Sequence, residues 1–228
     1  MSPASSNWLA EVGAVFAKEW RAELRTRYAL NTFALFGLTT LFTASASLGT
    51  LSIPLAERAA VLPVILWLIL LFALTAGLPR TFVHEEETHT ATALRLAASP
   101  VALFVGKQAY NLVLTLALEA LVAPLFLVLF DLEVQNVGVF LATLVAGAFG
   151  LATGSTLVAA MIAAAQGKST LFAVLALPVL LPLLLFTVQL SRSALTGEAP
   201  GQALPALLLY DASVAVAALL LFPVVWNP

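Results

Sequence analysis

Residues 134–167 read VQNVGVFLATLVAGAFGLATGSTLVAAMIAAAQG, a run of 34 residues without a single charge. About 20 mostly apolar residues in an α-helix are enough to cross the ~30 Å hydrocarbon core of a bilayer. The run therefore predicts one membrane-spanning helix, placed at Val137–Ala165. Barrel strands would alternate apolar and polar residues over short segments, so this unbroken run favours a helix over a spanning β-strand.

Five further segments are long and mostly apolar, although two of them contain charged residues, and they predict five more spans. They are Tyr28–Leu48, Ala59–Pro79, Val101–Phe130, Ser169–Ser191 and Ala203–Trp226. The predicted fold is all-α, a polytopic membrane protein with six transmembrane helices that form one permease-like domain over residues 1–228.

The composition of the whole chain agrees with that fold and excludes other classes. Of its 228 residues, 61% are hydrophobic and only 10% are charged, and the mean hydropathy is +1.03. An average soluble domain carries roughly 25% charge. A soluble enzyme, a disordered chain and a nucleic-acid binder are therefore excluded. The chain also has no cysteine, which excludes disulfides and thiolate metal sites.

Lysine and arginine residues predict how the chain is oriented, because they concentrate in cytoplasmic loops. With the N-terminus inside, the inner segments hold eight of the ten basic residues, and the outer loops hold only Arg58 and Arg192. Both termini are therefore expected in the cytoplasm. The charges among residues 7–27 leave no room for the apolar core of a secretory signal.

Two segments on the predicted inner side are not spans. Residues 7–27 place apolar side chains at helical spacing and predict an amphipathic helix, either in the membrane interface or packed on the protein core. Trp8 and Trp20 favour the interface. The interfacial residues of most interest are Phe16, Glu19, Trp20 and Arg21.

Residues 80–100 form the longest inner loop, which begins with an acidic cluster and ends at Pro100. A short, charged inner helix would suit a membrane subunit that receives force from a soluble ATPase. The alternative is a merely solvated loop. The predicted docking residues are Phe82, Glu85, Glu86 and Leu94.

Three motifs resemble catalytic or metal-binding sites but lack the residues or the spacing that such sites require. The segment Gly167-Lys168-Ser169-Thr170 lacks the first glycine and the preceding strand of a phosphate-binding loop. His84 and His89 are five residues apart and diverge by ~140° around a helix, so they cannot share a metal ion. Gly147, Gly150 and Gly154 favour a packing face over an intramembrane serine protease at Ser155. No catalytic, metal-binding or cofactor-binding residue is therefore predicted.

Polar residues and prolines inside the spans are the remaining candidates. Glu119 is costly at membrane depth and is either a substrate-path or interhelical polar residue, or a neutral carboxyl hydrogen-bonded to Thr115. Asp211 is expected to be a polar anchor near the outer interface, with a path residue as the alternative. The prolines expected to kink their helices are Pro124, Pro178 and Pro182.

The order of several motifs resembles the haem exporter protein B (CcmB) family. The similar segments are Phe16-Ala17-Lys18-Glu19-Trp20-Arg21, the acidic loop Phe82-Val83-His84-Glu85-Glu86, the pair Lys107 and Asn111, the two-proline span Leu177–Leu184, and Tyr210-Asp211 through Pro223. In one departure, Thr90–Leu94 contains no glycine where the family often has Gly-Thr-Leu.

The resemblance implies the permease subunit of an ABC transporter that acts in cytochrome c maturation in the inner membrane. It implies an ATPase partner CcmA, the membrane proteins CcmC and CcmD, the haem chaperone CcmE, and a homodimer of the permease. ATP and any haem would then be bound by partners. The alternatives are an ABC-type-2 exporter of a lipid, drug or polysaccharide, and a non-transporting membrane scaffold.

Overall fold

The computed structural model describes residues 8–77, 94, 97–164 and 171–226. These residues form seven long α-helices and no strand, so the all-α prediction is confirmed for this part of the chain. The helices are α1 (Trp8–Thr26), α2 (Tyr28–Ser52), α3 (Leu55–Gly77), α6 (Pro100–Leu129), α7 (Val137–Ala164), α8 (Leu171–Thr196) and α9 (Ala203–Trp226).

The six helices after α1 are long and apolar enough to span a membrane, which confirms the six predicted spans. The helix α3 begins at Leu55, four residues earlier than predicted, and two helices end later than predicted. The end of α2 is set by Pro54, because the residue before a proline favours extended backbone, and Ile53 adopts it. The helix α8 continues to Thr196 and ends at Gly197, whose φ of 75° favours glycine.

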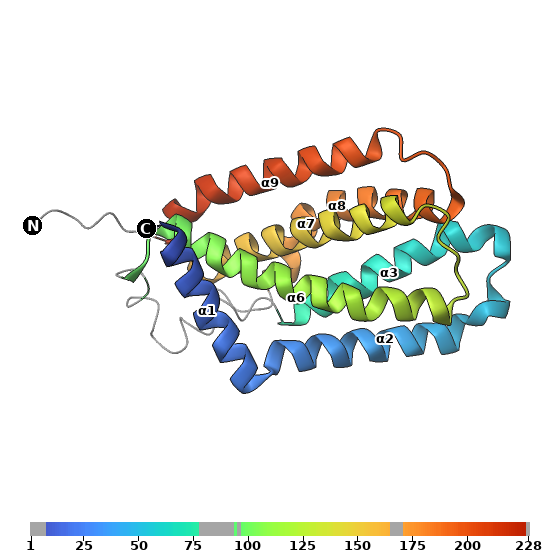
Figure 1. The fold of residues 1–228 in the computed structure, drawn as a ribbon, viewed down its shortest axis with the longest axis horizontal. Coiled ribbons are helices and arrows are strands. Elements are labelled where there is room, and N and C mark those ends of the chain that lie inside the picture. The colour runs from blue at the N-terminus through green and yellow to red at the C-terminus, as the bar shows by residue number, and fades with distance from the viewer. Residues whose placement is uncertain (1–7, 78–93, 95–96, 165–170, 227–228) are drawn as a thin grey trace, which may run out of the picture.

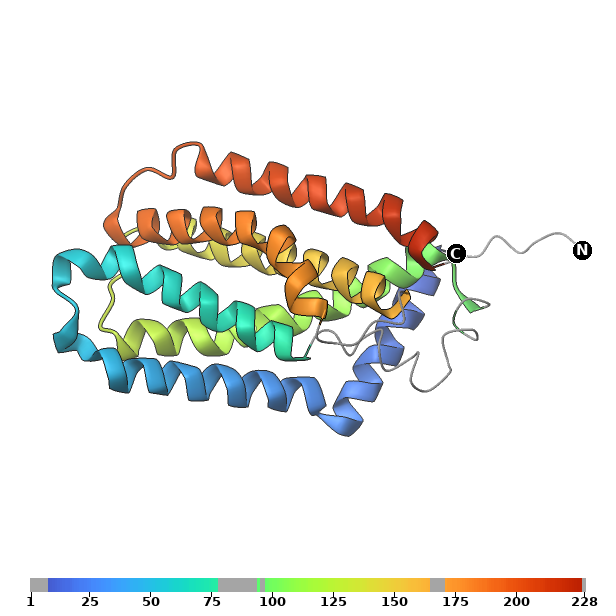
Figure 2. The same cartoon turned by 180° about the vertical axis from the view of Figure 1, so that it is seen from behind.

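The six spans run up and down one elongated bundle, and α1 crosses it at one end (Figure 1). We call this end, where α2 starts and α9 finishes, the α1 end. Seen from behind, α3 and α8 lie in front of α6 and α7, while α2 and α9 form the two long edges of the bundle in both views (Figure 2). The two central helices are α6, which packs against α1, α2 and α7, and α7, which packs mainly against α8 and α9.

The small-residue face predicted on α7 is confirmed. A Cβ atom added at Gly147 would overlap the ring of Trp67, and one added at Gly154 would lie 2.7 Å from a methyl carbon of Leu180. Together with Gly150 between them, these glycines let side chains of α3, α8 and α9 approach the α7 backbone. Close packing of this kind drives helix association in membranes. Lipid tails are as apolar as the helix surfaces, so the hydrophobic effect does not drive the helices together.

Hydrogen bonds between side chains also connect α3 to α8 and α6 to α7. Each joins a donor to a hydroxyl group in the interior, so that neither polar group faces lipid alone. The bonds are Trp67 Nε1–H to Ser191 Oγ (2.9 Å), Gln108 Nε2–H to Thr153 Oγ1 (2.8 Å) and Asn111 Nδ2–H to Thr156 Oγ1 (2.8 Å).

Each proline that the sequence singled out lies inside a helix that continues past it. Pro124 interrupts α6, and Pro178 and Pro182 interrupt α8. Pro63 in α3 and Pro223 in α9 were not among the predicted kink residues. Kinking at these positions stays a prediction.

We expect Gly147→Ala to lower the free energy of unfolding by about 1–3 kcal/mol, because the added methyl group overlaps the buried ring of Trp67. Gly13→Ala is the matched control. Nothing lies within 4 Å of a Cβ atom at Gly13, and the same change in an open helix stabilises by about 0.5–1 kcal/mol. Thermal unfolding of both variants in detergent measures the difference, and equal melting temperatures would contradict the packing face.

Candidate functional site

The helix α1 lies along the first part of α6 and contacts it through a row of residues four apart. Positions four apart on a helix share one face, and this face carries Glu11, Val15, Glu19 and Glu23. Glu23 is only 6% exposed. Three carboxylates thus point toward α6 from one side of α1, and each has a specific partner.

Lys107 of α6 is fully buried and forms an ion pair with Glu19. Its Nζ atom donates to Glu19 Oε1 at 2.8 Å, and Lys18 Nζ lies 3.3 Å from the same oxygen. Burial by itself would raise the pKa of Glu19, but the charges of Lys107 and Lys18 and their hydrogen bonds outweigh it and lower the pKa below its ordinary value of 4.5. Glu19 is therefore ionised, and its negative charge compensates the buried ammonium group.

Glu23 joins three helices at the point where α1 ends. Its Oε1 atom accepts a hydrogen bond from the Leu30 backbone N–H at 2.9 Å, and its Oε2 atom accepts one from the Tyr110 hydroxyl at 3.2 Å. One carboxylate therefore caps the start of α2 and also holds α6. Between α1 and α2, Arg27 alone turns the chain, with a left-handed φ of 52°.

The length of α6 explains why these contacts are needed. At 1.5 Å per residue its 30 residues are about 45 Å long, whereas the hydrocarbon core is about 30 Å thick. Tyr110 lies level with the start of α2, because Glu23 binds both. The 20 residues from Tyr110 to Leu129 then span about 30 Å, and Lys107 lies just beyond them, where α1 covers it.

Glu11 and Gly106 complete the contact between α1 and α6. Glu11 Oε2 accepts hydrogen bonds from Ser99 Oγ at 2.7 Å and from the Ser99 backbone N–H at 3.0 Å. A Cβ atom at Gly106 would lie 2.7 Å from Val15 Cβ, so glycine is required for this close approach. The segment that leads from residues 80–93 into α6 is thereby fastened to α1.

Of the predicted ATPase-docking residues, the structure places one. Leu94 is half-buried against the hydrophobic core, and its carbonyl accepts a hydrogen bond from the Ala98 N–H at 3.1 Å. Phe82, Glu85 and Glu86 lie outside the described residues. Their docking role stays a prediction.

The predicted interfacial helix packs on α6 through its acidic residues. The sequence alone did not predict that these residues form the packed face. Phe16 and Trp20 are half-buried and stack with ring centroids 6.2 Å apart, while Arg21 is exposed. Trp8 and Leu24 remain exposed on the outer side of α1. The four-residue spacing of the acidic residues, together with a lysine in an apolar span, is the sequence signal that could have revealed the contact.

The buried carboxylates of the spans differ from what the sequence predicted. Glu119 is 2% exposed, and neither carboxyl oxygen has a hydrogen-bond partner in the described part of the chain. The bond to Thr115 considered from the sequence is therefore wrong for the described structure, and the Thr115 hydroxyl donates to the carbonyl of Asn111 in its own helix at 2.8 Å. Glu119 therefore stays a candidate for a substrate-path or interhelical role.

Asp211, which the sequence predicts to be a polar anchor near the outer interface, is buried inside the bundle. It is 4% exposed and packs against Gly150 of α7, where a Cβ atom would overlap its carboxyl group. The missing side chain of Gly150 creates the space that Asp211 fills. Beside it, the Tyr210 hydroxyl donates to the Val179 carbonyl at 2.5 Å and ties α9 to the two-proline helix α8.

The fold and the site together define a multi-pass helical membrane protein whose surface helix α1 is joined to a central span by a buried ion pair. The chain belongs to the CcmB family, because the family model described as CcmB protein matches residues 10–226. The chain is also similar to Heme exporter protein B of Bradyrhizobium diazoefficiens, with 30% identity over 136 residues. That match covers 59% of this chain and 61% of the relative's length.

We expect Glu19→Gln to destabilise the protein by about 3–5 kcal/mol, because it removes the carboxylate charge that pairs with the buried Lys107 ammonium at 2.8 Å. The double variant Glu19→Gln with Lys107→Met should regain most of this loss. Glu133→Gln, an exposed carboxylate outside the helices, is the control and should be neutral. Thermal unfolding in detergent is the measurement. A double variant no more stable than Glu19→Gln would contradict a charge-based contact.

The same ion pair predicts a pH dependence. A carboxylate whose pKa is lowered by folding stabilises the protein above its unfolded pKa, and this stabilisation is lost as the pH falls through the folded pKa. The difference in melting temperature between wild type and Glu19→Gln should therefore be constant near neutral pH and shrink below about pH 4.5. A difference that persists unchanged to pH 3 would show that Glu19 acts through packing rather than charge.

Proposed function

We propose that this chain is the permease subunit of an ABC transporter for cytochrome c maturation, with both termini on the cytoplasmic side of the inner membrane. In this role it couples ATP hydrolysis by a separate ATPase subunit to haem export or to release of the haem-loaded chaperone. Membership of the CcmB family and similarity to a protein named Heme exporter protein B support the proposal. The chain itself is then a transporter subunit and not an enzyme.

The observation that carries the proposal is the attachment of α1 to α6 at three places along α1. Glu11, Glu19 and Glu23 bind Ser99, Lys107 and Tyr110, respectively. Since α6 runs the length of the bundle and packs on α7, a displacement of α1 moves a central span directly. A surface helix fixed in this way can receive force from a soluble partner and transmit it into the membrane.

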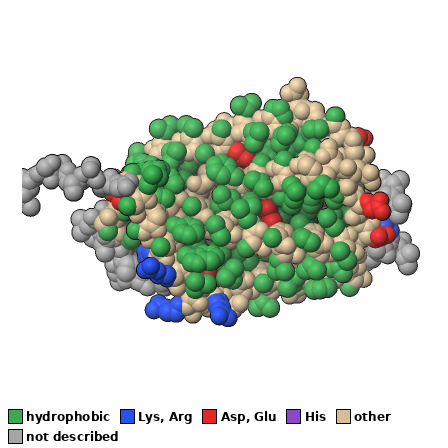
Figure 3. Space-filling model, viewed as in Figure 1, with side chains coloured by type: hydrophobic (Ala, Val, Ile, Leu, Met, Phe, Trp, Pro, Cys, Tyr) green, Lys and Arg blue, Asp and Glu red, His purple; other side chains and the backbone are tan. Residues whose placement is uncertain are grey.

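The distribution of charge supports a cytoplasmic location for the α1 end. Lys18, Arg21, Arg25, Arg27 and Lys107 lie at or near this end, and Figure 3 shows basic side chains gathered below the corner where α1 meets α2. In the described segments, the opposite end carries the basic residues Arg58 and Arg192. Cytoplasmic segments are the ones enriched in lysine and arginine.

The partner proteins in this proposal are those that the resemblance to the CcmB family implies. CcmA would supply ATP hydrolysis, CcmC and CcmD would handle haem in the membrane, and CcmE would receive or release it, with the permease itself as a homodimer. The docking surface for CcmA would combine the residues 80–100 loop with α1. Glu11 and Ser99 connect the two, because Ser99 ends that loop and is bound to α1.

We expect the double variant Glu85→Ala with Glu86→Ala to lose most of the ATPase that co-purifies with the tagged wild-type protein from its native membrane. Glu133→Ala with Glu198→Ala, two exposed carboxylates at the opposite end of the bundle, is the charge-matched control. Mass spectrometry identifies the partners, absorbance reports haem in the eluate, and melting temperature checks folding. Removal of two acidic side chains from the docking surface is the physical reason for the expected loss.

Each outcome of this pull-down decides between functions. An ATPase together with CcmC, CcmD and CcmE supports the haem-exporter role. An ATPase without them supports an ABC-type-2 exporter of another substrate. No ATPase with the wild-type protein supports a scaffold, and wild-type ATPase yield with the double variant overturns the docking residues while leaving the function intact.

A further inference from the structure

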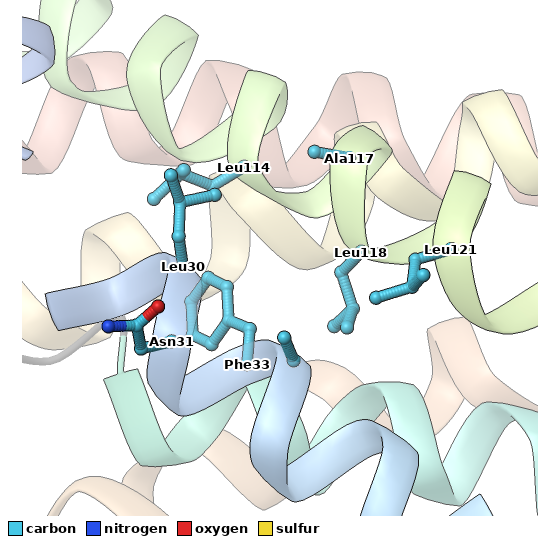
Figure 4. Close-up of a pocket in the computed structure, with 8 residues that line it drawn as sticks. Leu30, Asn31, Phe33, Leu114, Ala117, Leu118 and Leu121 are labelled. Carbon is cyan, nitrogen blue, oxygen red and sulfur yellow. The ribbon is translucent and has the colours of Figure 1, made fainter. Parts of the chain in front are cut away.

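A hollow of about 230 Å³ lies on the seam between α2 and α6, within the membrane-spanning segments of both helices. Figure 4 shows leucine and phenylalanine side chains around this space, with Asn31 at its edge beside Phe33. The lining residues are Leu30, Asn31, Phe33, Ala34, Leu114, Ala117, Leu118 and Leu121.

The size and lining of the hollow restrict what can occupy it. Seven of the eight lining residues are apolar, so water would find few hydrogen-bond partners there. A helix of another protein is about 10–12 Å across with its side chains, too wide for this volume. An acyl chain of a membrane lipid is narrow and apolar, and it is present wherever these helices face the bilayer.

Basic residues precede the end of the hollow nearest α1 in the chain. The Asn31 N–H donates to the Arg27 carbonyl at 3.0 Å, which places Arg27 one helical turn from Asn31 toward α1. Arg21 and Arg25 are four residues apart on the last part of α1. All three side chains are exposed, and in the described segments they form no ion pair. Figure 3 shows basic side chains at this corner.

We propose that this seam is a binding site for one anionic phospholipid, whose acyl chain fills the hollow between α2 and α6 and whose phosphate is bound by Arg27, with Arg21 and Arg25 adding positive potential. The hollow and the arginines lie at the depths in the membrane expected for the acyl chain and the phosphate of a lipid. The hollow begins at Leu30, in the first turn of α2, and extends along the span, while the arginines lie at the surface. The proposal is independent of the transported substrate and of the ATPase.

Lipid retention by the full-length protein in detergent tests this site. Native mass spectrometry compares phosphatidylglycerol with phosphatidylcholine of identical acyl chains. We expect preferential retention of phosphatidylglycerol. About 1 kcal/mol per basic residue at a membrane surface predicts a roughly fivefold weaker preference in Arg27→Gln. Arg192→Gln, an exposed arginine at the opposite end, is the matched control and should retain the wild-type preference.

A second variant tests the hollow separately from the charge. Ala34→Leu places three more carbons among the lining residues and should reduce retention of both lipids, while its melting temperature without added lipid confirms that it folds. Equal retention of the two lipids by the wild type would overturn the site. Weaker binding in Arg27→Gln but unchanged binding in Ala34→Leu would show surface attraction only and would also overturn it.

Discussion

The buried ammonium group of Lys107 is the constraint on which the arrangement of the α1 end depends. A charge without a partner in a low-dielectric interior costs several kcal/mol, so a carboxylate must lie within reach. Glu19 provides it at 2.8 Å, and α1 must therefore lie against α6 and not apart from it in the membrane interface. With α1 fixed there, Glu23 reaches both Tyr110 and the start of α2, and Arg27 has to turn the chain from α1 into α2 within one residue.

The rest of the bundle is held by contacts of a different kind. Between the spans, close approach at glycines and hydrogen bonds to hydroxyl groups replace the charges found at the α1 end. Trp67 shows both, because its ring packs on Gly147 while its indole N–H donates to Ser191. The acidic residues within the spans, Glu119 and Asp211, are buried without such partners in the described structure.

The spans could be predicted from the sequence because a long apolar run has one physical solution in a bilayer, a helix that satisfies its own backbone. The prediction for α1 was less complete. Its apolar residues suggested contact with lipid, but which face packs on protein depended on Lys107, which lies 88 residues after Glu19. The burial of Asp211 depends in the same way on the absent side chain of Gly150, a contact between helices that no single helix pattern reveals.

The sequence separation within the α1 contact has a consequence for synthesis of the protein. Glu11 and Glu19 each bind a residue 88 positions later in the chain. At a translation rate of about 5–20 residues per second, α1 emerges from the ribosome roughly 4–18 s before its partner on α6. During that interval α2 and α3 must enter the bilayer while the acidic row of α1 is still in water. The exposed Trp8 and Leu24 can hold the waiting helix on the membrane surface until α6 arrives.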